Sequence, residues 1–353
     1  MNSTPPRALL GVDAFTRTDL LAAAATLGML SVLLFGAVGR AGVQGSASAC
    51  LDNHRALAGA WVAYANDHDG QLANNLGLTE IMATVSARTY LNWANNVMDW
   101  TMTGMNTNMA MMASGPLAPY LRTNALVFHC PADTYVSSPQ RAAGWLRRAR
   151  SYSMNAFMGL NSRLNDPAIS TGRNSYVPNF RQFLRLSSIP KPGATYVFLD
   201  EHPDSINDGM FLNYPSRPTS WTDMPASFHD GACGFGFADG HAEMHVWQFA
   251  STKVPVRFIF SPPVIPSAQS GDYKWVAART SVDPTTLGLS RNAPGKGQVT
   301  WSSLPVNYVL QVTPSLTPAT WTDVSPAPTR GMGQCATAVD LNAERGFYRL
   351  IRR

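Results

Sequence analysis

The sequence has few charged side chains and lacks several motifs that identify enzymes. Only 14% of its 353 residues are Asp, Glu, Lys or Arg. It contains no Gly-x-Ser-x-Gly elbow, and no glycine-rich loop that could cradle a phosphate follows a predicted strand. Ser151 and Ser153 have no identifiable base. These absences disfavour hydrolytic and phosphate-binding chemistry, and we predict that the protein is not an enzyme.

The chain also lacks any recognisable nucleic-acid-binding motif. Its net charge of +5 is modest, and its densest basic cluster comprises Arg141, Arg147, Arg148 and Arg150. A solvated basic loop is the ordinary explanation for such a cluster, so we predict no nucleic-acid partner. The hydrophobic content of 45% is sufficient for a sizeable core.

One long segment near the start contains no charge. Residues 20–39 are uncharged and largely apolar, and twenty residues at about 1.5 Å per residue span roughly 30 Å, the thickness of a bilayer's hydrocarbon core. We therefore predict a transmembrane helix. A cleaved secretory signal is the competing interpretation, because Arg7 precedes this segment and small residues follow it at 47–49. The segment is longer than the usual signal core of about 7 to 15 residues.

Residues 14–19, Ala-Phe-Thr-Arg-Thr-Asp, directly precede this segment. They resemble a prepilin cleavage site, at which a prepilin peptidase cuts between Ala14 and Phe15 and leaves the apolar helix attached. The resemblance implies that Asp19, the fifth mature residue, neutralises the terminal amine of a neighbouring subunit. The site departs from the family in having Ala14 in place of Gly, Asp19 in place of Glu, and Arg17 where an apolar residue is commoner.

The order of periodic segments predicts an α+β fold. Cys50, Leu57, Trp61 and Tyr64 recur on one helical face, so we expect the first helix to continue to about Ala65. Strand-like residues come later, at 195–199 and in a hairpin at 234–247 that turns at Asp239-Gly240. We predict a long N-terminal transmembrane helix packed on an antiparallel sheet, as in a pilin-like head.

The C-terminal part has a different composition. Proline and glycine at 281–298 indicate a linker, and aromatic and β-branched residues among turns at 299–353 predict a small β-rich module. The predicted organisation is therefore a leader at 1–14, the pilin helix at 15–65, a globular head at 66–280, the linker, and the C-terminal module.

A second resemblance depends on the spacing of His229, nine intervening residues, and then Asp239-Gly240. This spacing is similar to the signature of large pseudopilin-like proteins from bacteria related to planctomycetes and verrucomicrobia. The segments at 50–53, 64–67, 128–131, 150–155 and 198–209 also resemble that family, which extends the likeness over about residues 14 to 280.

This resemblance implies a structural subunit of a type II secretion or type IV pilus-like assembly. Its partners would be other pilin-like subunits, the prepilin peptidase and the inner membrane. The protein would cross that membrane once, with a cytoplasmic N-terminus and with the C-terminal domains in the periplasm or at the cell surface. A membrane-tethered binding protein that does not polymerise remains the alternative.

Four cysteines permit three fully paired connectivities. We predict a disulfide between Cys50 and Cys130, because Cys50 falls on the first helix and Cys130 lies in a strand-to-turn segment expected to fold back against it. Disulfides persist outside the cytoplasm, where this part of the chain is expected.

No cofactor is required by any motif, but one segment is rich in oxygen donors. Asp200, Asp204, Asn207 and Asp208 follow a predicted strand and could hold a structural calcium ion. They could equally cap turns through bonds to backbone amides, and both interpretations remain open. Zinc on the hairpin residues His229, Asp239, His241 and His245 is disfavoured, because neither a Cys pair nor a helix-borne His-Glu motif accompanies them.

Overall fold

The computed structural model describes residues 16–352, with gaps at 123, 163–165, 167–171, 283–286, 303–307, 326, 332–333 and 342–345. For residues 28, 30–43, 302, 330, 331, 334 and 352 only the backbone is described. The chain divides into two compact units, residues 1–45 and 46–353, and each is described by itself.

The first unit contains the start of helix α1 (Arg17–Asp67). A capping box begins the helix: the amide of Asp19 donates to Thr16 Oγ1 at 3.2 Å, and the amide of Thr16 donates to Asp19 Oδ2 at 3.0 Å. The next turns carry exposed apolar side chains. Leu20, Leu27 and Met29 are each 68% exposed.

The predicted transmembrane helix is not found. Within the described residues, no helix combines the length and the apolar content that a membrane crossing requires. The described side chains of the predicted segment are those of 20–27 and 29, about half of the roughly 20 residues that a crossing needs. The predicted transmembrane helix and single-pass inner-membrane location are therefore wrong for the part of the chain described.

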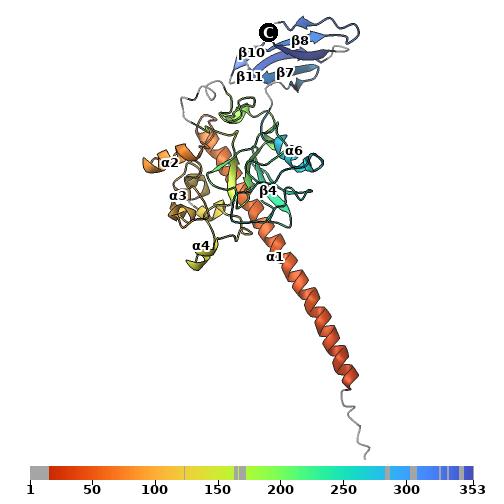
Figure 1. Cartoon of the computed structure of the whole chain (residues 1–353). Coiled ribbons are helices and arrows are strands. Elements are labelled where there is room, and N and C mark those ends of the chain that lie inside the picture. The colour runs from red at the N-terminus through yellow and green to blue at the C-terminus, as the bar shows by residue number, and fades with distance from the viewer. Residues whose placement is uncertain are drawn as a thin grey trace, which may run out of the picture. The chain divides into compact units, whose positions relative to one another are not determined.

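The second unit contains a five-stranded sheet with strand order β3-β1-β2-β4-β5, of which β4 is labelled in Figure 1. Its strands are β1 (Tyr152–Asn155), β2 (Tyr196–Asp200), β3 (Met210–Phe211), β4 (Ala232–Phe237) and β5 (Ala242–Val246). β1 and β3 are parallel, and the other neighbours are antiparallel. The predicted fold class, which had a purely antiparallel sheet, is therefore also wrong. The sheet is mixed, because β3 lies parallel to β1 and is reached through a crossover connection.

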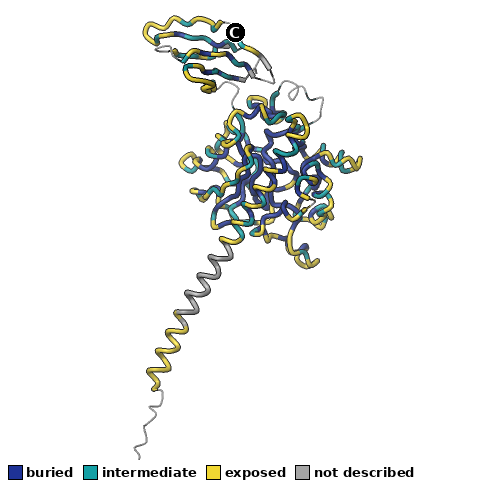
Figure 2. The backbone as a smooth tube through the Cα atoms, turned by 180° about the vertical axis from the view of Figure 1, so that it is seen from behind, coloured by how far each residue is buried: buried dark blue, intermediate teal, exposed yellow. Residues whose placement is uncertain are grey.

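The main core of this unit joins helix and sheet residues. Leu57 and Trp61 of α1 are fully buried in the same cluster as Val197 and Phe198 of β2. Figure 2 shows that buried residues are concentrated in the interior of this unit. The shorter helices of the unit are α2 (Leu78–Ser86), α3 (Met109–Ala113), α4 (Ser138–Ala142) and α6 (Gly271–Ala277).

Single turns of 3-10 helix complete the helical structure: η1 (Gly104–Asn106), η2 (Ala118–Leu121), η3 (Ala125–Phe128), η4 (Leu186–Ser188), η5 (Pro192–Ala194) and η6 (Ser267–Gln269).

The predicted hairpin is confirmed, since β4 and β5 pair through Gly236 and Ala242 on either side of the turn. Gly240 has a φ of +94°, which favours glycine at this point of the turn.

The C-terminal residues form two antiparallel sheets, as the β-rich prediction requires. One has the order β10-β11-β7-β6 and the other β12-β8-β9. Their strands are β6 (Gly288–Ala293), β7 (Lys296–Ser302), β8 (Tyr308–Thr313), β9 (Thr322–Asp323), β10 (Thr329–Gly331), β11 (Gln334–Asp340) and β12 (Phe347–Arg352). β6 lies within the predicted linker, because Pro294 and Gly295 form the turn between two strands.

Candidate metal centre

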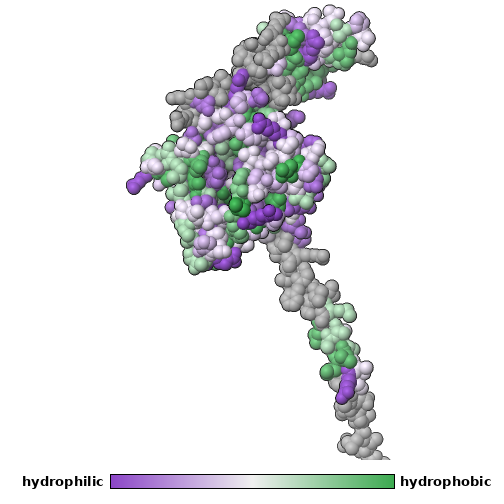
Figure 3. Space-filling model, in the orientation of Figure 1, coloured by the Kyte–Doolittle hydropathy of each residue, from purple (hydrophilic) through white to green (hydrophobic). Residues whose placement is uncertain are grey.

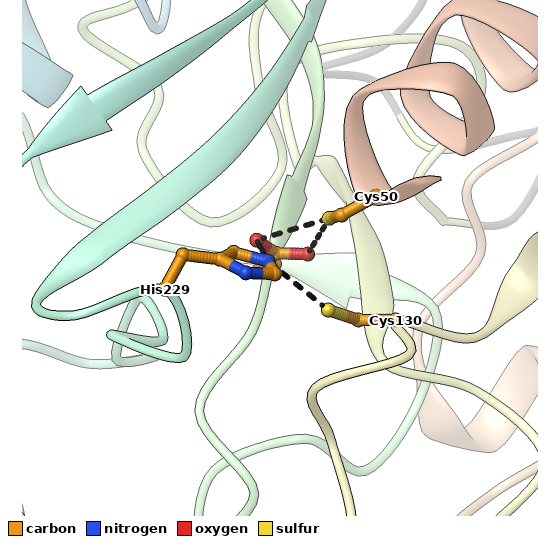
Figure 4. Close-up of side chains that lie close together, drawn as sticks. Cys50, Cys130 and His229 are labelled. Carbon is orange, nitrogen blue, oxygen red and sulfur yellow. Dashed lines mark hydrogen bonds and ion pairs between the residues drawn. The ribbon is translucent and has the colours of Figure 1, made fainter. Parts of the chain in front are cut away.

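Four metal-ligating side chains meet at a buried point in the second unit. They are Cys50 of α1, Cys130 after η3, Asp200 at the end of β2, and His229 before β4 (Figure 4). One donor atom from each lies within 4.8 Å of those from the other three. This buried Cys/Asp/His cluster could hold a metal ion.

Local structure explains how Cys50 and His229 reach the cluster. Cys50 shares its helical face with Leu57 and Trp61, so burial of that face also buries the thiol. His229 lies at the start of a tight turn closed by a hydrogen bond from the Ala232 amide to the His229 carbonyl at 3.2 Å. The middle residues of this turn, Asp230 and Gly231, both have positive φ, which is the geometry that Asp-Gly favours.

The contacts within the cluster are short. Cys50 Sγ lies 3.2 Å from Asp200 Oδ1 and 3.6 Å from Asp200 Oδ2. Cys130 Sγ lies 3.2 Å from His229 Nε2, and the same nitrogen lies 3.9 Å from Asp200 Oδ2. The carboxylate of Asp200 is therefore at the centre of the group.

A surrounding layer of contacts fixes that carboxylate. The amide of Gly234 donates to Asp200 Oδ2 at 2.7 Å, and His54 Nε2 lies 3.3 Å from Asp200 Oδ1. On the other side of the cluster, the hydroxyl of Tyr152 donates to Cys50 Sγ at 3.5 Å. Asp200 is therefore held in one orientation by both the sheet and the helix.

Burial and hydrogen bonding set the protonation of the metal-free cluster. Burial raises the pKa of the Cys50 thiol well above its usual value and raises that of Cys130. Burial lowers the pKa of His229. Burial alone would raise the pKa of Asp200, but the contacts with His54 and Gly234 outweigh this effect and lower the pKa. Without a cation, the cluster therefore consists of neutral thiols and a neutral imidazole around one carboxylate.

Close packing at Gly234 is necessary for this arrangement. A Cβ atom there would lie 2.7 Å from His54 Cδ2, 2.8 Å from His54 Nε2 and 3.2 Å from Asp200 Oδ2. We expect Gly234→Ala to lower the free energy of unfolding by about 1–3 kcal/mol, the usual cost of overpacking. Gly104→Ala is the matched control, since nothing lies within 4 Å of its added Cβ. Equal urea midpoints for the two variants would contradict this expectation.

The prediction that Cys50 and Cys130 lie close together is confirmed. The prediction that a disulfide joins them is wrong. Both residues are free thiols. The two thiols interact with each other without a covalent bond, and Cys50 also contacts Asp200 while Cys130 contacts His229.

The four residues proposed for calcium do not come together as one site. The carboxylate of Asp204 accepts the amides of Arg257 at 2.6 Å and Phe258 at 2.8 Å. Asn207 Oδ1 accepts the amide of Asp208, and Asp208 Oδ1 accepts the amide of Met210. Asn207 and Asp208 therefore make the local turn-capping bonds of the alternative interpretation, whereas Asp204 binds backbone amides of a distant segment. Only Asp200 joins the metal-ligating cluster, whose thiols do not suit calcium, a cation that takes oxygen ligands.

The His229 and Asp239-Gly240 motif is divided between the two ends of β4. His229 belongs to the cluster, whereas Asp239 Oδ1 accepts the backbone amide of His241 at 3.1 Å and orders the hairpin turn. His245 stacks on the ring of Trp275 at 3.7 Å. Among the described residues, the hairpin histidines therefore form no metal-ligating group with Asp239.

The remaining predicted site residues lie at the N-terminus. Ala14 and Phe15 are outside the described residues, so cleavage between them stays a prediction. Asp19 lies in the first turn of α1.

Sequence reasoning missed His54 altogether, although Cys50 and His54 are four residues apart and thus share a helical face.

Comparison with protein-family profiles, curated proteins and solved structures finds no match to this chain. The pseudopilin resemblance therefore remains a prediction from the sequence motifs.

Proposed function

We propose that this chain is a non-enzymatic, pilin-like structural subunit that assembles with copies of itself through the start of helix α1. The observation that carries the proposal is the exposed apolar surface of that segment. Leu20, Leu21 and Leu27 are 68–69% exposed, and Met29 extends the apolar surface to another side of the helix. Figure 3 shows hydrophobic residues along its described part. A helix that is apolar all round requires a partner surface to cover it.

The small residues of the segment suit a helical partner. The alanines at 22–25 let a neighbouring helix approach closely, since the distance between packed helices depends on the side chains at their contact. The hydroxyl of Thr26 donates to the carbonyls of Ala22 and Ala23 at 2.9 Å. Its polar group is thus satisfied within its own helix, and helix packing would leave no unpaired hydroxyl.

Asp19 supplies a charge for the contact between subunits. Hydrogen bonds from the side chain and backbone of Thr16 lower the pKa of Asp19, so its carboxylate is charged at neutral pH. Both bonds end on Oδ2, which leaves Oδ1 with acceptor capacity. In the proposed assembly this carboxylate pairs with the terminal amine of a neighbour that a prepilin peptidase has cleaved before Phe15.

The prepilin-like residues 14–19 and the His229 to Asp239-Gly240 spacing support an assembly of the type II secretion or type IV pilus kind.

The absence of enzymatic chemistry is proposed as well. The strongest acid–base candidates, Glu201, His202 and Asp204, bond to separate partners: Ser205, the Val254 carbonyl and the amides of the 257–258 segment.

Cysteine crosslinking tests the assembly. We expect Leu20→Cys and Leu27→Cys, each with one accessible thiol per chain, to form covalent dimers on oxidation, because copies of the helix lie side by side. Leu146→Cys is the matched control: Leu146 is 88% exposed but lies outside the helix, and this variant should stay monomeric. The four native cysteines are buried and should not react.

Asp19→Asn in the Leu27→Cys background separates charge from helix capping, because asparagine still accepts the Thr16 bonds. A lower crosslinking yield is expected from the lost charge pair. If the helix variants remain monomeric at the level of Leu146→Cys, the assembly proposal is wrong.

A further inference from the structure

We propose that Cys50, Cys130, Asp200 and His229 bind one zinc ion as a structural site. The proposal is independent of assembly through α1, since it concerns only the second unit. The donors are two sulfurs, one imidazole nitrogen and one carboxylate oxygen. These are the three ligand types that zinc takes in proteins, and four is the number in its closed, structural sites.

The spacing of the donors matches the size of a zinc site. Zinc bonds of about 2.0–2.3 Å in a tetrahedron place neighbouring donor atoms about 3.3–3.8 Å apart. Cys50 Sγ is 3.2 and 3.6 Å from the two oxygens of Asp200, and Cys130 Sγ is 3.2 Å from His229 Nε2. The nitrogen of His229 and Asp200 Oδ2 are 3.9 Å apart. The remaining donor pairs lie within 4.8 Å, so shifts of about 1 Å or less would convert the hydrogen-bonded cluster into a tetrahedral site.

The charge of the site can also be balanced. Two thiolates and one carboxylate carry three negative charges, of which a zinc ion neutralises two. His54 is completely buried, and its Nε2 lies 3.3 Å from Asp200 Oδ1. An N–H group of His54 directed at this oxygen would stabilise the remaining negative charge and orient the carboxylate, as outer residues commonly do for metal ligands. His54 is thus a positioning residue of the site.

The connections of the site indicate a structural role. The ligands come from a helix, two turns and the end of a strand, so one ion would tie together four segments that are distant in the sequence. All four ligands are buried, and they fill the four positions of a tetrahedral ion. Catalytic zinc sites keep one position for water or substrate, which this set of donors does not provide.

The test uses the full chain, purified under reducing conditions and incubated with zinc sulfate. After removal of free metal by gel filtration, elemental analysis should find one zinc per chain. Replacement by Co²⁺ should produce the near-ultraviolet thiolate-to-cobalt bands and the intense visible bands of a four-coordinate ion. A chain that retains no zinc, or a cobalt spectrum without thiolate bands, overturns the proposal.

Variants then assign the ligands. Cys130→Ser and His229→Ala should lose stoichiometric zinc, whereas Cys335→Ser and His241→Ala should retain it, because these control residues lie outside the cluster. His54→Ala should lower zinc affinity by about tenfold to a hundredfold, the usual effect of removing an outer partner. Zinc content unchanged in the folded ligand variants, checked by circular dichroism, contradicts the assignment. The wild-type cobalt spectrum does not depend on whether the variants fold.

Discussion

Replacement of Arg150 by methionine is expected to lower the free energy of unfolding by about 3–5 kcal/mol, the cost of removing one member of a buried charged network. Arg150 is fully buried beside β1. Its guanidinium donates to Asn96 Oδ1 at 3.2 Å, to the Tyr152 carbonyl at 2.5 Å and to Ser153 Oγ at 2.8 Å. It also donates to the carbonyls of Asn207 and Asp208. Methionine fills similar space but leaves these acceptors unpaired in a dry interior.

The charge of Arg150 persists in spite of burial. Burial lowers the pKa of Arg150 to about 10, so the side chain is still protonated at neutral pH. Its positive charge lies near the buried Asp208, whose pKa burial raises to about 6, so this carboxyl is mostly ionised at neutral pH. Loss of the guanidinium therefore removes both hydrogen bonds and a favourable charge.

Urea unfolding followed by tryptophan fluorescence measures this effect. Arg141→Met is the matched control, because Arg141 is exposed and its substitution should change stability by less than about 0.5 kcal/mol. If Arg150→Met unfolds at the same urea concentration as this control, the buried network contributes no stability.

Arg148 and Arg150 also show where sequence reasoning was wrong. The basic cluster was expected to be a solvated loop, yet both of these residues are buried. Arg148 lies over the ring of Trp100 at 3.9 Å and donates to the Pro203 carbonyl. These partners are an aromatic ring and a backbone carbonyl, 48 and 55 residues away in the chain, and a local pattern of charges cannot reveal them.

Local patterns predicted the parts of the fold that depend on near neighbours. Helical spacing from Cys50 to Tyr64 predicted the helix that ends at Asp67, and Asp239-Gly240 predicted the β4–β5 hairpin. The parallel pairing of β1 with β3 was missed. β3 contains only Met210 and Phe211, too few residues to show an alternating pattern.

The candidate site was predicted only in pieces for the same reason. Cys50 and Cys130 were expected to meet, and His229 was identified through its spacing from Asp239. Asp200 was grouped with Asp204 and Asp208, its sequence neighbours, although its side chain contacts Cys50, His54 and Gly234. A site assembled from four distant segments depends on tertiary packing, which spacing alone does not encode.

Removal of zinc with a chelator is expected to destabilise the second unit strongly. An ion that binds only the folded state adds about 4 kcal/mol of stability when its free concentration is a thousandfold above the dissociation constant. The core that contains Cys50 and Cys130 also includes many apolar side chains that are not ligands, such as Leu57, Trp61 and Phe198, so the chelated protein should remain folded but melt at a lower temperature. Thermal unfolding of the full chain with excess zinc and with EDTA measures the difference.

The dependence on pH gives a second signature of the same ion. Thiols and imidazole must lose their protons to bind zinc, so acid releases the metal. Burial raises the pKa of the Cys50 and Cys130 thiols in the metal-free protein, which increases the pH at which protons compete with zinc. The zinc-dependent part of the stability should therefore disappear as the pH falls. At each pH, the melting temperature of Cys130→Ser should be the same with excess zinc as with EDTA. A melting temperature of the wild type that is insensitive to EDTA would show that the four side chains are held together by their hydrogen bonds alone.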